Sequence, residues 1–193
     1  MQTLLDLDKK ILLFLNSLNH PVLDQIMYYS TGTFFWLPLY LFLIFLIYKN
    51  YRKETWFILL GAVVTIILAD QITTSLMKPF FARLRPSQDP SLQNLVHLVN
   101  GYKGGLYGFA SSHAANTFGT ALFIWLVVRP FYKGVGWIFV WAIFMTYTRI
   151  YLGVHYPGDI LAGAAIGLGC GWAGYRCSLW LINKCGKAQS ISK

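Results

Sequence analysis

The chain has 193 residues, of which 56% are hydrophobic and only 12% are charged, and its mean hydropathy is +0.51. A soluble domain carries about 25% charged residues. This composition therefore excludes a disordered chain, a basic nucleic-acid-binding domain and most soluble enzymes, and it indicates an integral membrane protein. The net charge of +9 is then typical of cytoplasmic loops and of contact with anionic lipids. The three cysteines, Cys170, Cys177 and Cys185, lack metal-site spacing and predict no metal or redox role.

The first thirty residues mix leucines and isoleucines with charged side chains. They predict an amphipathic helix in the membrane interface, or a short sixth element of a bundle. Five apolar stretches follow, at 34–48, 56–77, 109–128, 134–154 and 160–182. A membrane crossing needs about 20 residues, which four of the stretches approach and the first does not. The sequence thus predicts an all-α integral membrane bundle of five to six helices, with residues 1–193 forming one domain.

Basic residues predict the orientation of this bundle. The turns at 49–53 and 129–133 and the C-terminal tail hold eight lysines and arginines on one side. By the positive-inside rule that side is cytoplasmic. Seven basic residues fall on the other side, and three of these, Lys78, Arg85 and Arg149, have a chemical reason to be there. We therefore expect a multi-pass membrane protein whose opposite face lies outside the cytoplasm. We take the membrane to be a bacterial inner membrane, so that this face points to the periplasm.

Three polar clusters interrupt the ends of the apolar stretches, at residues 78–86, 109–113 and 149–159. Polar groups at membrane depth are costly and mark function. The chain crosses twice between the second cluster and the third, so all three clusters should meet on the periplasmic face. The side chains brought together there would be Lys78, Arg85, Ser111, Ser112, His113, Arg149, His155 and Asp159.

These residue types fit phosphate chemistry. Lysine and arginine bind a phosphate oxyanion, and arginine does so in bidentate geometry. Serine and backbone N–H groups at a helix start supply further donors. Two histidines can divide the work of nucleophile and acid, and Asp159 can orient His155. Because carboxylates are scarce here, we expect neither a metal site nor a cofactor.

At these residues the sequence resembles the type 2 phosphatidic acid phosphatase superfamily, which shares its fold with vanadium haloperoxidases and bacterial acid phosphatases. The family signature is Lys-x6-Arg-Pro, then Pro-Ser-Gly-His, then Ser-Arg-x5-His-x3-Asp. Lys78 and Arg85-Pro86 match the first part, Ser111 and His113 match the second, and Arg149, His155 and Asp159 match the third. The resemblance covers residues 78–159, the expected catalytic core.

The resemblance implies a role for each matched residue. His155 would be the nucleophile that becomes phosphorylated, His113 the general acid, and Asp159 the residue that orients His155. The phosphate would be bound by the side chains of Lys78, Arg85, Ser111, Ser112 and Arg149. Three positions depart from the family, with Ala110 for proline, Ser112 for glycine and Thr148 for serine, and we expect these to change the shape of the pocket rather than remove activity.

The expected function is hydrolysis of a membrane lipid phosphate or diphosphate without a metal. Among candidate substrates, the resemblance to the family favours the undecaprenyl (polyprenyl) diphosphate carrier first and lipid A second. Phosphatidylglycerol phosphate and phosphatidic acid are further candidates. An anion-selective transporter and a non-catalytic lipid-phosphate binder are alternatives of another class. Phosphate release would separate the enzyme from both, and no nucleic-acid partner is expected.

Three further features have two interpretations each. Arg83 would contact the lipid headgroup or extend to the interface, with its stem on apolar surface. Gly163, Gly167 and Gly171 form a small-residue stripe that favours packing within the bundle over a homo-oligomer interface. The polar loop at 87–107 is a lid over the site, or a connector.

Overall fold

The computed structural model describes residues 2–186, and the regular secondary structure of this range is helical, with a long loop between Phe81 and Ser112. The helices are α1 (Gln2–Ser17), α2 (Pro21–Ser30), α3 (Leu37–Tyr51), α4 (Thr55–Asp70), α5 (Lys78–Phe81), α6 (Ser112–Val128), α7 (Trp137–Tyr151) and α8 (Pro157–Leu181). A π-helical segment, Gln71–Met77, joins α4 to α5, and another, Ile182–Gly186, follows α8. The predicted all-α class is confirmed.

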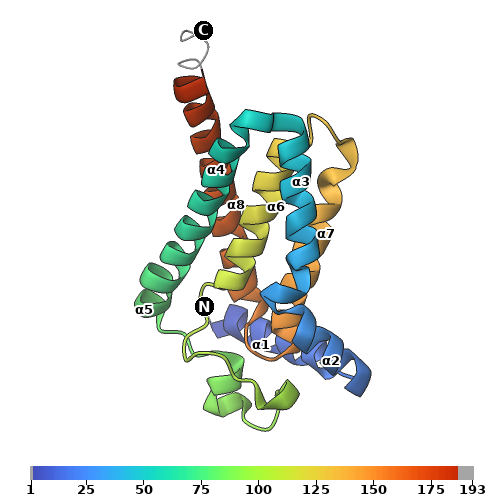
Figure 1. The fold of residues 1–193 in the computed structure, drawn as a ribbon. Coiled ribbons are helices and arrows are strands. Elements are labelled where there is room, and N and C mark those ends of the chain that lie inside the picture. The colour runs from blue at the N-terminus through green and yellow to red at the C-terminus, as the bar shows by residue number, and fades with distance from the viewer. Residues whose placement is uncertain (1, 187–193) are drawn as a thin grey trace.

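One helical stretch within the described residues, Thr33–Phe81, is long and apolar enough to cross a membrane, and Ser112–Val128 is apolar but shorter. The long stretch is not one straight rod. At Arg52 the backbone has φ 50°, and there the chain turns back, so that α3 and α4 run in opposite directions (Figure 1). The stretches predicted at 34–48 and 56–77 are therefore separate antiparallel helical segments, as the sequence indicated.

α6 lies at the centre of the upright bundle, where it packs against α4, α7 and α8 (Figure 1). Nine of its residues are buried and none is exposed, so α6 forms the core helix of the bundle. Ile58, Phe123, Ile138 and Trp141 are among the buried side chains of this core. α6 begins at Ser112, three residues later than predicted, because Ser111 caps it: the Ser111 side chain accepts a hydrogen bond from the N–H of Ala114.

The glycine stripe of α8 is used inside the bundle. A Cβ atom at Gly163, Gly167 or Gly171 would collide with the backbone oxygen of Ser111, Ala115 or Gly119 of α6, in that order. The two helices are therefore parallel and in backbone contact along the stripe, as small residues allow. The packing interpretation is confirmed, and the predicted homo-oligomer contact through the stripe is wrong because α6 covers it.

α1 and α2 lie across the lower end of the bundle, beside the loop that joins α5 to α6 (Figure 1). α1 is amphipathic, as predicted: Leu12 is fully buried, whereas Leu4 and Phe14 are exposed. Asn16 ties α1 to the bundle, because its amide donates to the Tyr151 carbonyl at 2.7 Å. The N-terminal segment thus belongs to the same end of the molecule as the three polar clusters.

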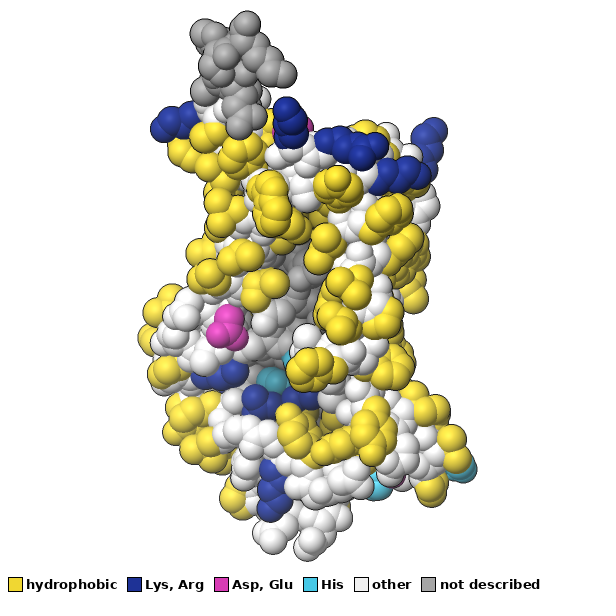
Figure 2. Space-filling view, in the orientation of Figure 1, with side chains coloured by type: hydrophobic (Ala, Val, Ile, Leu, Met, Phe, Trp, Pro, Cys, Tyr) yellow, Lys and Arg dark blue, Asp and Glu magenta, His cyan; other side chains and the backbone are white. Residues whose placement is uncertain are grey.

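Basic side chains gather at two places along the bundle. Figure 2 shows one group at the top end and another in a hollow near the lower end, beside histidine. The loops between α3 and α4 and between α6 and α7 form the top end. Lys187 and Lys193, two of the eight basic residues counted on the predicted cytoplasmic side, lie outside the described residues. The two ends that the sequence distinguished by charge are therefore opposite ends of the fold.

Candidate active site

The loop after α5 places Arg85 in the site. α5 ends at Ala82, which has φ 43°, and the following segment pairs with the end of the same loop. Arg85 N–H donates to the Leu106 carbonyl at 3.1 Å, and Gly108 N–H donates to the Arg83 carbonyl at 2.8 Å. The Arg85 side chain then donates from Nε to the Tyr107 carbonyl at 3.1 Å. The guanidinium is buried and fixed by its own loop before any substrate arrives.

A tight turn between α7 and α8 carries His155. Gly153 has φ +69°, and a Cβ atom there would collide with Val96, so this position requires glycine. Val154 N–H closes the turn by donating to the Arg149 carbonyl at 3.1 Å. Because of this turn, Arg149 ends one helix and His155 precedes the next, and both point into the same site.

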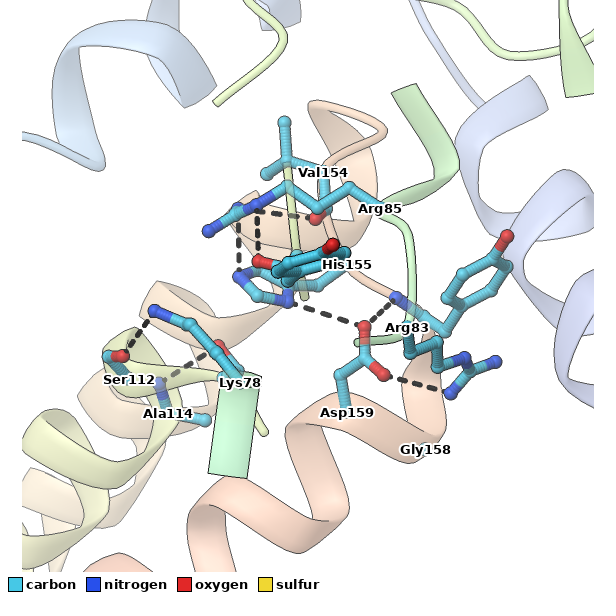
Figure 3. A network of polar contacts seen from close by, with 12 residues as sticks. Lys78, Arg83, Arg85, Ser112, Ala114, Val154, His155, Gly158 and Asp159 are labelled. Carbon is cyan, nitrogen blue, oxygen red and sulfur yellow. Dashed lines mark hydrogen bonds and ion pairs between the residues drawn. The ribbon is translucent and has the colours of Figure 1, made fainter. Parts of the chain in front are cut away.

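The hydrogen bonds of His155 define its tautomer. Arg85 Nη1 lies 3.1 Å from His155 Nε2, and a guanidinium can only donate, so Nε2 holds the lone pair. The proton is then on Nδ1, which lies 3.4 Å from Asp159 Oδ2. Figure 3 shows the imidazole between Arg85 and Asp159. This arrangement directs a nucleophilic nitrogen toward the arginines and its N–H toward the carboxylate.

The charge state of His155 follows from its surroundings. Its side chain is 2% exposed, and burial, with the cations Arg85 and Arg149 adding to it, lowers the pKa of His155 well below the usual range. The imidazole is therefore neutral at physiological pH. A neutral imidazole is the form that can attack phosphorus.

Lys78 and Ser112 meet on one side of the site. Lys78 Nζ donates to Ser112 Oγ at 2.7 Å, and the same hydroxyl is in contact with Thr73 and Thr74 of the π-helical segment. Ser111 is fully buried, and its hydroxyl accepts the capping bond from Ala114. The backbone donors at the start of α6 and the Lys78 ammonium therefore lie together, as the sequence predicted.

Two residues that the sequence analysis missed support Arg149. Arg149 Nη1 donates to Thr31 Oγ1 at 3.0 Å, and Nη2 donates to the Tyr102 hydroxyl at 3.1 Å. Thr31 Oγ1 is also 3.5 Å from His113 Nε2. Thr31 follows α2 and Tyr102 belongs to the loop at 87–107, so neither lies in a motif. The sequence signal that could have indicated them is that both are polar and lie at the end of the bundle where the three polar clusters meet.

Asp159 lies in the first turn of α8 and is fully buried. Its Oδ2 accepts from the N–H of Tyr156 at 3.0 Å, and its Oδ1 accepts from Arg83 Nη1 at 2.8 Å. Arg83 also pairs with Asp8 of α1 at 2.7 Å. Neither interpretation of Arg83 from the sequence describes this arrangement, because its guanidinium binds two carboxylates of the protein.

Two cavities meet at His113. One of about 730 Å³ is lined by aromatic side chains of α2 and the segment after it, together with Tyr102 and Arg149. The other, about 660 Å³, is an apolar groove between α3, α4, α6 and α7, with Leu43, Val63 and Ile124 among its walls. The hollow that Figure 2 shows beside histidine lies on this face of the molecule. The cationic site thus opens to a polar-rimmed cavity and to an apolar groove.

Comparisons with known proteins find relatives over most of the chain. The family model of the PAP2 superfamily matches residues 59–183. A lipid A 4'-phosphatase of Bacteroides thetaiotaomicron is 41% identical over 177 residues, 91% of this chain and 78% of that protein. A lipid A 4'-phosphatase of Porphyromonas gingivalis is 38% identical over 182 residues, 93% of this chain and 76% of that protein.

Solved structures share the fold. LpxE of Aquifex aeolicus superimposes with a TM-score of 0.67 at 28% identity, covering 88% of this chain and 95% of that one. A transmembrane PAP2-type phosphatidylglycerolphosphate phosphatase of Bacillus subtilis superimposes with a TM-score of 0.61 over 90% of this chain and 85% of that one. At 24% identity the second likeness shows the fold alone.

The family match spans more than half of the chain and includes the three clusters that converge on His155. Because the family and the similar proteins are phosphatases, the transporter and the non-catalytic binder are excluded as the main function. The chain therefore belongs to the PAP2 superfamily, and it is a phosphatase.

Proposed function

We propose that the chain removes a phosphate group from a membrane glycolipid through a phosphohistidine intermediate. His155 Nε2 attacks phosphorus, the bond between phosphorus and the lipid oxygen breaks, and His113 protonates that oxygen. Water then attacks phosphorus while His113 removes a proton from that water. The bond between phosphorus and His155 Nε2 breaks, which returns the neutral imidazole, and inorganic phosphate leaves. The single observation that carries this proposal is the placement of the neutral His155 Nε2 3.1 Å from the Arg85 guanidinium.

Three cations would hold the phosphate: Lys78, Arg85 and Arg149. Arg149 is 6% exposed, and its Nε is a buried donor without a hydrogen-bond partner among residues 2–186. A buried donor of this kind costs free energy until an acceptor reaches it. A phosphate oxygen beside Arg149 would supply that acceptor, and the N–H groups at the start of α6 would add to it.

We propose that the reaction needs no metal. Phosphoryl transfer requires charge neutralisation around the transferring group. Here Lys78, Arg85 and Arg149 supply positive charge where other enzymes use metal ions. Asp159, the nearest carboxylate, already accepts bonds from Arg83 and Tyr156.

The two cavities support a glycolipid phosphate as the substrate class. A lipid phosphate has an apolar chain beside its phosphate, and the groove that starts at His113 is apolar enough to hold such a chain. On the other side, Tyr28, Tyr29 and Tyr102 line a cavity wide enough for a sugar. A glycolipid would occupy both the apolar groove and the cavity lined by the tyrosines, whereas a polyprenyl diphosphate has no sugar to place in that cavity.

The similar proteins point to the same substrate, since two of them are named lipid A 4'-phosphatases. We therefore propose a lipid A-type glycolipid phosphate as substrate. This corrects the expectation from the sequence, which placed the undecaprenyl diphosphate first and lipid A second. That order of candidate substrates rested on the family resemblance and on no residue of this chain, and the comparisons favour lipid A.

We further propose that α3, α4, α6, α7 and α8 cross the membrane while α1 and α2 lie in its outer interface. α8 has 25 residues, enough to cross a hydrocarbon core of about 30 Å. α6 has 17 residues and is shorter than that core. Its start, with His113, would therefore lie at or slightly below headgroup depth on the periplasmic side, where a lipid phosphate is found.

The test is phosphate release by the purified protein from a panel of lipids at equal surface concentration. The panel contains lipid A, undecaprenyl diphosphate, phosphatidylglycerol phosphate and phosphatidic acid. We expect kcat/KM to be highest for lipid A. Higher kcat/KM for undecaprenyl diphosphate would contradict the glycolipid assignment.

A pair of variants examines the sugar cavity directly. Tyr29 lines it and is exposed, so Tyr29→Leu should fold normally. We expect it to lower kcat/KM for lipid A but not for phosphatidic acid. Tyr48→Leu, at another exposed position at the opposite end of the bundle, is the control. An equal loss for both lipids would show that Tyr29 does not recognise a sugar.

A further inference from the structure

A partly buried network connects α1 to the candidate nucleophile. Asp8 of α1 accepts from Arg83 Nη2 at 2.7 Å, and Arg83 Nη1 donates to Asp159 Oδ1 at 2.8 Å. The other oxygen of Asp159 lies 3.4 Å from His155 Nδ1. Figure 3 shows Arg83 on the side of Asp159 away from His155. The chain of contacts therefore runs from the N-terminal helix to the imidazole.

The positive charge of Arg83 is paired with carboxylates of the protein while this network is intact. Its two terminal nitrogens are each bonded to a carboxylate, and its guanidinium carbon lies 4.0 Å from the centre of the Tyr156 ring. Its side chain is 21% exposed, so it is shielded from the membrane surface on most sides. The cations of the phosphate site, in contrast, gather around Nε2 on the other side of His155.

Asp159 depends on this arginine. A fully buried carboxylate has lost its hydration and needs a cation or several donors to remain charged. Among residues 2–186, Arg83 is the lysine or arginine that forms an ion pair with Asp159. Without it, the carboxylate would keep only the Tyr156 N–H and the long contact to His155.

Asp8 in turn holds Arg83 and the start of α8. Its second oxygen accepts from Gly158 N–H at 2.8 Å, one of the free donors of the first turn of that helix. Next to it, Lys9 pairs with Asp89, which accepts from the Tyr156 hydroxyl at 2.9 Å. α1 therefore supports both faces of the segment that carries His155.

We propose that Arg83, held by Asp8 of α1, is a positioning residue that fixes Asp159 and through it the imidazole of His155. On this account α1 is part of the support of the active site and not only a membrane anchor. The inference rests on His155 being the nucleophile, as proposed above, and it does not depend on which lipid is the substrate.

The experiment measures kcat and KM separately for phosphate release from a short-chain lipid phosphate. We expect Arg83→Ala to lower kcat roughly 100-fold, the loss that a displacement of about 1 Å causes at a reacting group, with KM changed less than threefold. Arg83→Lys keeps the charge but reaches one carboxylate only, so we expect a smaller loss. We expect Asp8→Asn to lower kcat roughly tenfold.

Matched controls separate this effect from a general loss of charge. Asp6→Asn removes an exposed carboxylate from the same helix, and Arg129→Ala removes an arginine that also lies over an aromatic ring, Trp125 at 4.2 Å. Both should keep the kcat of the unmodified protein. Arg83→Lys and Asp8→Asn retain most of the network and test the proposal even if Arg83→Ala fails to fold.

A double-mutant cycle gives the sharpest readout. If Arg83 acts through Asp159, the Arg83→Ala change should cost little further kcat in an Asp159→Asn background. Full multiplication of the two losses would overturn the proposal, because Arg83 would then act elsewhere. So would a rise in KM at unchanged kcat, which indicates contact with substrate.

His155→Ala distinguishes a failure of the positioning role from a failure of the proposed nucleophile. If His155→Ala is inactive while Arg83→Ala and Asp8→Asn match the unmodified protein, the positioning role is wrong and the nucleophile stands. If His155→Ala keeps its turnover, the proposed nucleophile is wrong and the positioning role falls with it.

Discussion

The backbone contact between α6 and α8 allows a graded perturbation of the site by single methyl groups. Alanine at Gly163, Gly167 or Gly171 would place a Cβ atom against a backbone oxygen of α6, whereas alanine at Gly169 would meet nothing within 4 Å. Backbone atoms of a packed helix cannot rotate away, so the two helices must separate. The four positions lie on one helix and differ in what they face.

The magnitudes follow from two opposing terms. Overpacking costs about 1–3 kcal/mol, and the change from glycine to alanine in a helix returns up to about 1 kcal/mol. We therefore expect a net loss of about 1–2 kcal/mol for each stripe position and a gain for Gly169→Ala. Thermal unfolding in detergent measures both, with Gly169→Ala as the control.

The effect on catalysis should depend on distance from the site. Gly163 faces Ser111, which caps α6 two residues before His113, so separating the helices there moves His113 relative to His155. A shift of about 1 Å corresponds to roughly a 100-fold loss of kcat. Gly171 lies eight residues deeper, about 12 Å along the helix, and Gly171→Ala should cost far less.

The assay is kcat for lipid phosphate hydrolysis by the variants at a temperature where all are folded. Unchanged stability of the stripe variants would contradict the packing described here. Equal losses of kcat at Gly163 and Gly171 would refute the positional argument, since the effect would then be global.

Three further predictions concern the chemistry. His113→Ala should lower kcat for lipid phosphates by about 10²–10⁴-fold, because their alkoxides need a proton, and should cost aryl phosphates much less; equal losses on both would contradict the acid role. Since the pKa of His155 is lowered, the acid limb that it sets in kcat/KM should lie below pH 6.5. The unfolded chain binds a proton there that the folded chain does not, so the stability that His155 contributes should fall as pH drops below about 6.5. A loss of stability at acid pH that is the same size in His155→Gln would belong to another group. Excess EDTA should leave turnover unchanged; activity that returns only with added magnesium would show that a metal takes part.

Much of the site could be predicted from the sequence. Polar residues at the ends of apolar stretches have few structural reasons to be there, and an even number of crossings returns the chain to the same side. That reasoning predicted that Lys78, Arg85, His113, Arg149 and His155 would meet, and the structure places them together. The motif spacing was informative because the turn at Gly153 holds Arg149 and His155 at a fixed offset.

The supporting residues could not be predicted in this way. Asp8, Thr31 and Tyr102 come from three separate segments and reach the site through tertiary contacts that leave no spacing in the sequence. Arg83 lies within the first cluster, but its role could not be predicted because an arginine at a membrane interface is common. Only the buried partners Asp8 and Asp159 distinguish it from an interfacial side chain.

The identity of the lipid was beyond the sequence for a physical reason. Phosphate ligands recognise the group that all the candidate substrates share, whereas the residues around the phosphate decide which lipid is bound. Those residues line cavities formed by α2, α3 and α4, and the shape of a cavity depends on packing that no motif records.

Phosphorylation of His155 is the step on which the proposed mechanism depends. The direct measurement is rapid alkaline quench of the protein during turnover of an aryl phosphate, followed by digestion and mass spectrometry. We expect one phosphoryl group on the peptide that contains His155. We also expect more of this intermediate in His113→Ala, because deprotonation of the attacking water is slowed, and none in His155→Ala. A phosphoryl group on another residue, or turnover by His155→Ala, would show that His155 is not the nucleophile.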